Sequence, residues 1–263
     1  MAKVGIQLYT VRDLLAEDYE GTIVRMKELG YEGVEFPGGL MEKMNASDLK
    51  KLLGSAGLEL AGITFTHDDY TRRMDKILRY SRECGCTTVV YPWIPEELRK
   101  TADDYREIIR MMNNWGSVFK KKGIRFLYHL HGYELDKNRE DDGFSLMVKY
   151  FDWDVVQFEI DLYWVEYAGF DAMEIMEKYG QYSPSVHFKD YRDDGNWTDT
   201  EVGEGVIDME KAARLGLQRG ASWFIVEQEK FNMPSIESAA VSAKNLLRIR
   251  STAEKSLGGN WRV

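Results

Sequence analysis

The sequence lacks an apolar run of membrane-spanning length and, at its N-terminus, the apolar core of a signal peptide. It is also short of positive charge, because 35 Lys and Arg residues stand against 44 Asp and Glu residues, for a net charge of -9. A protein that holds a nucleic acid needs a basic surface to displace counterions. We therefore expect a cytoplasmic protein that binds neither a membrane nor a nucleic acid.

Cysteine is scarce, since Cys84 and Cys86 are the only two in the chain. They lie too close together for an ordinary disulfide and lack the C-x-x-C spacing of redox and zinc motifs, so we predict buried thiols at the end of a helix. The sequence also lacks a G-x-G-x-x-G motif after a strand. This absence argues against an open, doubly wound sheet with a dinucleotide site.

The sequence does contain a regular alternation of strand-like and helix-like segments. Strands are expected at residues 4–9, 33–36, 58–65, 87–91, 124–131, 155–161, 185–190 and 223–227. Helices are expected at residues 19–29, 47–55, 69–84, 102–122, 144–150, 171–179, 208–219 and 235–251. Such alternation favours parallel strands with right-handed crossovers. We predict an α/β fold in which one (β/α)8 TIM barrel domain spans residues 1–263, close to the usual size of about 250 residues.

The expected strands carry apolar side chains on one face and polar side chains on the other. In the sixth run, for example, Phe158 and Ile160 alternate with Glu159 and Asp161. A parallel strand that packs against helices on both faces would be almost entirely apolar. We therefore expect the polar faces to line the barrel interior, with functional groups at the C-terminal mouth, where TIM-barrel sites lie.

Four of these runs end in residues that can bind a metal. The fifth run carries His129 and His131 on one face, and the three later runs end in Asp161, His187 and Glu227. Together they offer two carboxylates and at least two imidazoles to one divalent ion. A mixed nitrogen and oxygen site favours Mn or Zn, with Co, Fe, Ni or Mg as alternatives. The pattern leaves open whether His129 or His131 is the ligand from the fifth strand.

Several segments of the chain resemble the sugar phosphate isomerase/epimerase family, whose xylose isomerase-like TIM barrels also include endonuclease IV and inosose dehydratase. The resemblance covers nearly the whole chain and is carried by GIQLYTVR (5–12), GVEF (33–36), YHLH (128–131), DLYW (161–164), HFKD (187–190), VGEG (202–205) and VEQE (226–229). It implies one metal at the barrel mouth, held by strands five to eight.

In that family the metal ligands are commonly Glu, Asp, His and Glu. The matching positions here are His129, Asp161, His187 and Glu227, so a histidine stands where the epimerases carry their first glutamate. The YHLH segment is similar to a subgroup with Tyr-His-Asn-His, although Leu130 replaces the asparagine. The resemblance thus implies a metal site with a departure at strand five.

The implied reaction is isomerisation or epimerisation of a monosaccharide or keto sugar. A metal at this position polarises the substrate carbonyl and stabilises the enediolate that forms when the neighbouring proton leaves. Glu227 would serve as ligand and base, His129 would replace the second glutamate of the epimerases, and Lys189 would stabilise the developing negative charge. Alternatively, Lys189 only pairs with Asp190 or Glu159.

Further side chains at or just past the strand ends are expected to contact the substrate by stacking or hydrogen bonding: Tyr9, Glu35, His67, Trp93, His131, Trp164 and Glu204. Glu204 lies in the glycine-flanked loop at residues 203–205, which we expect to be mobile and to fold over the substrate. No dedicated phosphate loop is evident, which favours an unphosphorylated sugar or polyol.

Other functions remain compatible with this pattern. A single base also suits β-elimination of water, so an inosose dehydratase-like enzyme or keto-sugar lyase is the first alternative. A DNA-repair enzyme related to endonuclease IV would need a basic groove and a three-metal cluster, which four histidines in an acidic chain disfavour. A non-catalytic sugar-binding barrel is a further alternative, and the sequence leaves homo-oligomerisation open.

Overall fold

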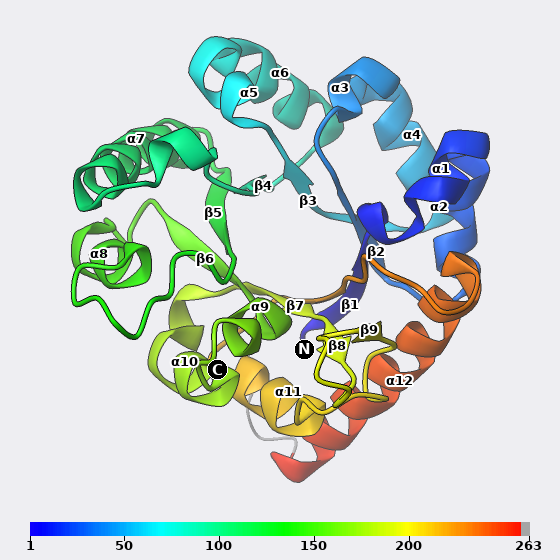
Figure 1. Cartoon of the computed structure of the whole chain (residues 1–263). Helices are drawn as coiled ribbons and strands as arrows, with labels where there is room; N and C mark the ends of the chain where they lie inside the picture. Colours follow the sequence, from blue (N-terminus) through cyan, green and yellow to red (C-terminus); the bar gives the residue numbers. More distant parts are fainter. Residues whose placement is uncertain (259–263) are drawn as a thin grey trace.

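Eight parallel strands close into a barrel in the computed structural model, which describes residues 1–258 (Figure 1). The strands are β1 (Lys3–Gln7), β2 (Gly33–Phe36), β3 (Glu59–Thr64), β4 (Thr88–Tyr91), β5 (Arg125–Leu130), β6 (Gln157–Asp161), β7 (Ser185–Phe188) and β10 (Trp223–Val226). Each strand pairs with its neighbours in the chain, and β1 pairs with β10 to complete the ring. The predicted TIM-barrel fold is confirmed.

Helices surround the barrel and cover the apolar outer faces of the strands (Figure 1). The long ones are α2 (Tyr19–Glu28), α4 (Ala46–Ala56), α6 (Met74–Cys84), α7 (Ala102–Lys120), α8 (Gly143–Tyr150), α10 (Ala172–Tyr179), α11 (Met209–Gln218) and α12 (Ser235–Ser256). Cys84 and Cys86 are buried free thiols at the end of α6, as predicted. Within residues 1–258, none of the helices combines the length and the apolar character that crossing a membrane requires.

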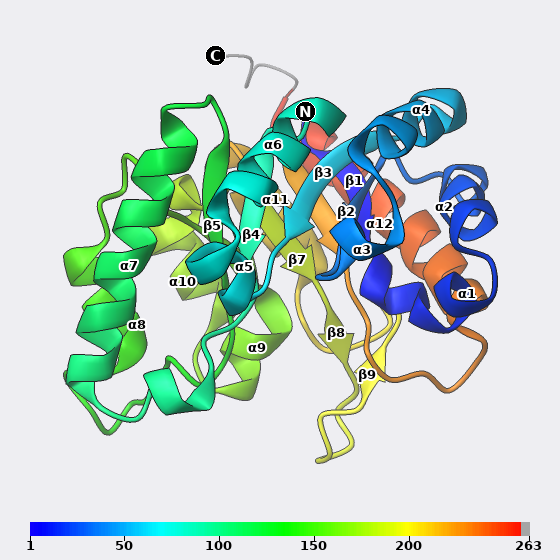
Figure 2. The same ribbon diagram turned by 90° about the horizontal axis from the view of Figure 1, so that it is seen from above.

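Several short elements, most of them at the C-terminal ends of the strands, were not predicted from the hydrophobic period. They are η1 (Leu8–Val11), α1 (Arg12–Glu17), α3 (Leu40–Lys43), α5 (His67–Arg72), η2 (Glu96–Leu98), α9 (Leu162–Tyr167), η3 (Gly180–Tyr182) and the strands β8 (Asp190–Tyr191) and β9 (Asp199–Thr200). Elements of two to six residues are too short to show a hydrophobic period. In Figure 2, β8 and β9 extend beyond the barrel on the same side as α9.

The helix expected at residues 69–84 is in fact two helices. α5 begins earlier than expected because Thr66 and Asp69 form a capping box, in which each side chain accepts a hydrogen bond from the other residue's backbone N–H. The N–H of Arg73 then bonds to the Asp69 carbonyl and ends α5 before α6 starts. The capping residues, not the hydrophobic period, determine this boundary.

The strand faces divide as the alternation predicts. Val4, Ile6 and Phe158 are fully buried in the apolar layer. On the inner face, Glu35 and Glu159 are equally inaccessible, with exposures of 1% and 0%. Burying carboxyl groups this completely requires partners for them, because an isolated buried charge costs several kcal/mol or more. The barrel interior is therefore polar and internally paired.

Candidate active site

A cavity of about 360 Å³ opens at the C-terminal mouth of the barrel. Its lining brings together carboxylates, imidazoles and two aromatic rings: Gln7, Tyr9, Glu35, Pro37, Gly38, Thr64, Pro92, Trp93, His129, His131, His187, Glu227 and Glu229. Among residues 1–258, no Lys or Arg side chain lines this cavity. Such a concave polar site with a few apolar surfaces suits a small polar molecule without negative charge.

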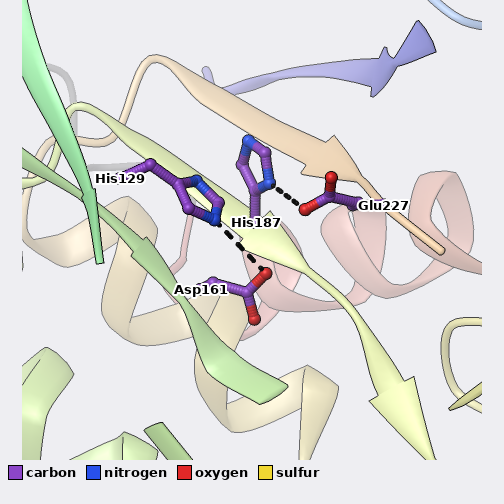
Figure 3. Close-up of side chains that lie close together, drawn as sticks. All are labelled: His129, Asp161, His187 and Glu227. Carbon is purple, nitrogen blue, oxygen red and sulfur yellow. Dashed lines mark hydrogen bonds and ion pairs between the residues drawn. The ribbon is translucent and has the colours of Figure 1, made fainter. Parts of the chain in front are cut away.

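The four predicted metal ligands lie close together at the barrel mouth, as Figure 3 shows, and all of them except Asp161 line the cavity. His129, Asp161 and His187 come from β5, β6 and β7, and Glu227 directly follows β10. Each offers one ligand atom, and these atoms lie within 4.8 Å of one another. His187 Nδ1 is 2.9 Å from Glu227 Oε2, and His129 Nε2 is 3.9 Å from Asp161 Oδ2. We call these four residues the quartet.

The hydrogen bonds of Asp161 show whether the quartet suits a cation. Its Oδ1 accepts a bond from the Trp164 backbone N–H at 3.0 Å, whereas its Oδ2 is buried and has no hydrogen-bond partner in the part of the chain that the structure describes. A buried oxygen without a partner is costly. Because Oδ2 faces the other three ligand atoms, a divalent ion in the quartet would satisfy it, and the residues fit a metal of the N/O-binding class.

The two histidines of the fifth strand differ in their position relative to the quartet. His129 belongs to the quartet, while His131 lies beyond the end of β5 and contributes no ligand atom to it. The Nδ1 of His131 is 3.3 Å from the His129 carbonyl, and its ring stacks on Tyr133. His131 still lines the cavity, where it is available to a substrate.

The electrostatics of the site reflect its surplus of carboxylates. Burial raises the pKa of Asp161 to about 6 and, with the charge of Glu159, that of Glu35 to about 7. Burial would also raise the pKa of Glu227, but the hydrogen bond and charge of His187 outweigh it and lower this pKa. Burial would lower the pKa of His187, yet the charges of Glu159 and Glu35 outweigh it and raise this pKa. The cluster therefore favours bound positive charge.

Lys189 is buried next to the quartet but does not line the cavity. Its Nζ donates to Glu229 Oε1 at 2.7 Å and lies 4.7 Å from the ring centres of both Tyr163 and Trp164. The partner is thus Glu229 rather than Asp190 or Glu159, the two considered from the sequence. Trp164 also differs from its expected position, because it packs over Lys189 and is not among the cavity residues.

His67 lies outside the cavity, contrary to the expectation of substrate contact. It is the first residue of α5, and its Nδ1 is 2.9 Å from the Tyr91 hydroxyl while its ring packs edge-on against Trp115 of α7. Tyr9 and Trp93 do line the cavity, with 43% and 50% of their surfaces exposed. The Arg12 guanidinium lies 4.5 Å from the centre of the Tyr9 ring, and the exposed surface of both rings can contact a ligand at the mouth.

Glu204 also lies away from the cavity. It accepts a hydrogen bond from Asn245 of α12, and the Asp190 carboxylate accepts bonds from the backbone N–H groups of Gly203 and Gly205. These contacts hold the loop against α12, which differs from the expected lid over the substrate. These contacts could not be predicted from the sequence, because Asp190 lies on β8, 13 residues before Gly203.

Replacing Asp190 with Ala is expected to lower the free energy of unfolding by about 3 kcal/mol. The carboxylate is buried and also accepts from the N–H groups of Tyr191 and Ile207, so the substitution leaves several backbone donors without partners. Denaturant unfolding measures the loss, with the exposed Asp193→Ala as the matched control. Equal stability of the two variants would contradict this account of the loop.

Two carboxylates that lie in or next to the cavity were not predicted as site residues from the sequence. Glu159 lies two residues before Asp161 on the same face of β6, and Glu229 lies two residues after Glu227. The period of two along these segments was the available signal. It places a side chain on a face but does not say which groups it contacts.

Comparisons with known proteins agree with the fold. The model of the xylose isomerase-like TIM barrel family matches residues 23–251. An inosose dehydratase from Geobacillus kaustophilus (strain HTA426) is 24% identical over 191 residues, which are 64% of this chain. The match spans 61% of that relative, less than two thirds of its length.

Solved structures support the same grouping. A sugar phosphate isomerase/epimerase from Parabacteroides distasonis ATCC 8503 has a TM-score of 0.78 at 24% identity, with 96% of each chain covered. The IOLI protein with a binding zinc atom has a TM-score of 0.74 at 14% identity, covering 95% of this chain and 99% of that one. At such identities these likenesses establish the fold alone. Because the family model matches most of its length, this chain belongs to the xylose isomerase-like TIM barrel family.

Proposed function

We propose that the chain is a divalent-metal-dependent enzyme that removes a proton next to the carbonyl of an uncharged keto sugar or inosose. The observation that carries this proposal is the convergence of the quartet at the barrel mouth, where three of its four residues line the cavity. Isomerisation or epimerisation is the reaction that we favour, and dehydration is the alternative. Both reactions begin with the same proton abstraction.

The quartet would hold the metal, and Mn or Zn suits its mixed ligands best. When bound, such an ion polarises the carbonyl and stabilises negative charge on the substrate oxygen. The IOLI structure with zinc lends support to this choice of metal. The remaining chemistry is assigned to side chains of this chain.

Glu227 is the favoured proton acceptor. It lines the cavity, and its lowered pKa keeps it ionised at neutral pH. Glu35 lines the same cavity from β2, and its pKa of about 7 leaves it partly protonated. Two carboxyl groups with separated pKa values suit a base and an acid. Glu35 would therefore return a proton to the substrate, or give one to a departing hydroxyl in the dehydration.

One specific observation favours dehydration. A partly protonated Glu35 near an ionised Glu227 provides the acid that loss of a hydroxyl group needs. The inosose dehydratase relative also supports dehydration. Endonuclease-like repair is not favoured, since the lining residues include three glutamates and, within residues 1–258, no Lys or Arg side chain.

The charge of the lining defines the substrate class. Glu35, Glu227 and Glu229 contribute negative charge, and the nearby Lys189 is paired with Glu229. A phosphate or carboxylate on the substrate would meet like charges, and no Lys or Arg side chain of residues 1–258 lines the cavity to offset them. The mouth rings of Tyr9 and Trp93 suit the C–H face of a sugar instead.

Metal analysis combined with a screen of keto sugars and inososes tests the proposal. We expect about one divalent ion per chain and a loss of turnover of at least about 100-fold after chelation, restored by Mn or Zn. A phosphorylated analogue is expected to have a kcat/KM lower by at least about 10-fold, because of like-charge repulsion. Deuterium uptake from solvent without water loss identifies isomerisation or epimerisation, and release of water identifies dehydration.

The same screen can overturn the proposal. Full activity after chelation would remove the metal from the mechanism. Sugar binding without turnover would make the chain a binding barrel, and cleavage of abasic DNA by a three-metal form would make it a repair enzyme.

A further inference from the structure

Glu159 lies directly beneath the quartet and contacts both of its imidazoles. It is 0% exposed, and its Oε2 is hydrogen-bonded to His129 Nδ1 at 3.1 Å. The same oxygen lies 3.2 Å from His187 Nε2, a buried nitrogen that has no hydrogen-bond partner among residues 1–258 while Nδ1 of the same ring is bonded to Glu227. The ring centres of the two histidines are 4.5 Å apart. One carboxylate oxygen thus faces one nitrogen on each ring, and in both cases it is the nitrogen opposite to the one that faces the quartet.

We propose that Glu159 is a positioning residue that accepts the Nδ1–H of His129 and the Nε2–H of His187, and so turns the other nitrogen of each ring toward the metal. This inference rests on the proposed function, since it assumes that the quartet holds a divalent ion. A neutral imidazole carries one N–H, and donating it to a carboxylate leaves the lone pair of the other nitrogen for a ligand bond.

The strand register explains why the two histidines use different nitrogens. His129 stands opposite Glu159 in the β5–β6 pair, so its near nitrogen, Nδ1, reaches the carboxylate and Nε2 points to Asp161. His187 stands opposite Asp161 in the β6–β7 pair, one level nearer the mouth. Its far nitrogen, Nε2, has to reach down to Glu159, which leaves Nδ1 facing Glu227.

Glu35 contacts one of these rings but does not have the same role. Its Oε1 is 3.3 Å from His187 Nε2 and already accepts a hydrogen bond from Gln7 Nε2 at 2.7 Å. No contact between Glu35 and His129 is found among the described residues. Glu159 therefore joins the two rings, and Glu35 supports only His187.

The chain contains only four histidines, which makes the test direct. Nuclear magnetic resonance of the zinc-loaded chain with ¹⁵N-labelled histidine reports which nitrogen of each ring carries the proton. We expect Nδ1–H on His129 and Nε2–H on His187. The opposite tautomer on either ring overturns the proposal, even without any variant.

The Glu159→Gln variant gives a second readout. The Gln amide oxygen can take the place of Oε2 between the two rings, but as a neutral group it is a weaker hydrogen-bond acceptor than the carboxylate. We expect zinc affinity, measured by competition with a chromogenic chelator, to fall about 10- to 100-fold. The matched control is Glu134→Gln, which changes another fully buried carboxyl whose partner is the Tyr128 hydroxyl rather than an imidazole.

The outcomes separate this inference from the proposed function. If Glu159→Gln binds zinc as tightly as the native chain, or if Glu134→Gln loses as much affinity, the positioning role is wrong while the metal site stands. If the native chain binds no zinc, the metal dependence is wrong. In that case the tautomers of the metal-free chain at alkaline pH still decide whether Glu159 orients the rings.

Discussion

Substituting Glu227 with Gln is expected to lower kcat by about 1,000-fold, the typical contribution of a positioned general base. The side chain is nearly buried, and its Oε2 lies 2.9 Å from His187 Nδ1. The amide keeps the shape of the carboxylate but cannot accept a proton at neutral pH, and it is a weaker metal ligand. The substitution therefore removes the base and weakens the metal site together.

Steady-state kinetics on the substrate found by the screen, at saturating metal, separates these two effects. Excess metal should restore metal binding by the variant, but most of the loss in kcat should remain because the base is still missing. The matched control is Glu237→Gln, the same change at an exposed position in the first turn of α12, which should leave kcat unchanged. A Glu227→Gln variant with kcat within about threefold of native would show that another group takes the proton.

Substituting Asp161 with Asn is expected to abolish metal binding and yet stabilise the metal-free chain by roughly 2 to 3 kcal/mol at neutral pH. Burial raises the pKa of Asp161 to about 6, above its ordinary value of 3.8. The folded state thus holds this proton more tightly than the unfolded state. The stabilising effect is complete below about pH 3.8 and is lost as the pH rises through about 6, so the ionised carboxylate destabilises the metal-free fold at neutral pH.

Denaturant unfolding of the chelated native chain and Asp161→Asn at several pH values measures this effect. The unfolding free energy of Asp161→Asn minus that of the native chain should increase between about pH 4 and pH 7 and then level off. The Asn side-chain oxygen can still accept the Trp164 N–H, so the local helix start is preserved. A difference that does not change with pH would show that Asp161 is not held at an energetic cost, and that its free oxygen is not kept for a metal.

Both substitutions change a carboxylate of the quartet. Burial disfavours the ionised form of Asp161, whereas His187 stabilises that of Glu227, so it is the unpartnered Oδ2 of Asp161 that a cation in the quartet would satisfy. Sites of this kind lose stability to gain function. Restoring metal to the native chain should therefore raise its stability, whereas the Asp161→Asn variant should show no such gain.

Much of this site could be predicted from the sequence, because strand periodicity assigns each residue to a face. Parallel strands bring their C-terminal ends to one rim, so metal-binding residues that end β5, β6, β7 and β10 meet there. The eight strands, the polar interior and the residues of the quartet follow from this pattern. Short rim helices such as α5 and α9 did not follow, because capping and turns determine them.

What only the tertiary structure decided is the direction and depth of individual side chains. His129 and His131 share a face in the sequence, yet β5 ends at Leu130 and only His129 joins the quartet. Lys189 pairs with Glu229, and Glu159 joins two rings from different strands, because register between strands sets which groups lie level. A period along one strand carries no information about the register of its neighbours, so these contacts arise only when the barrel closes.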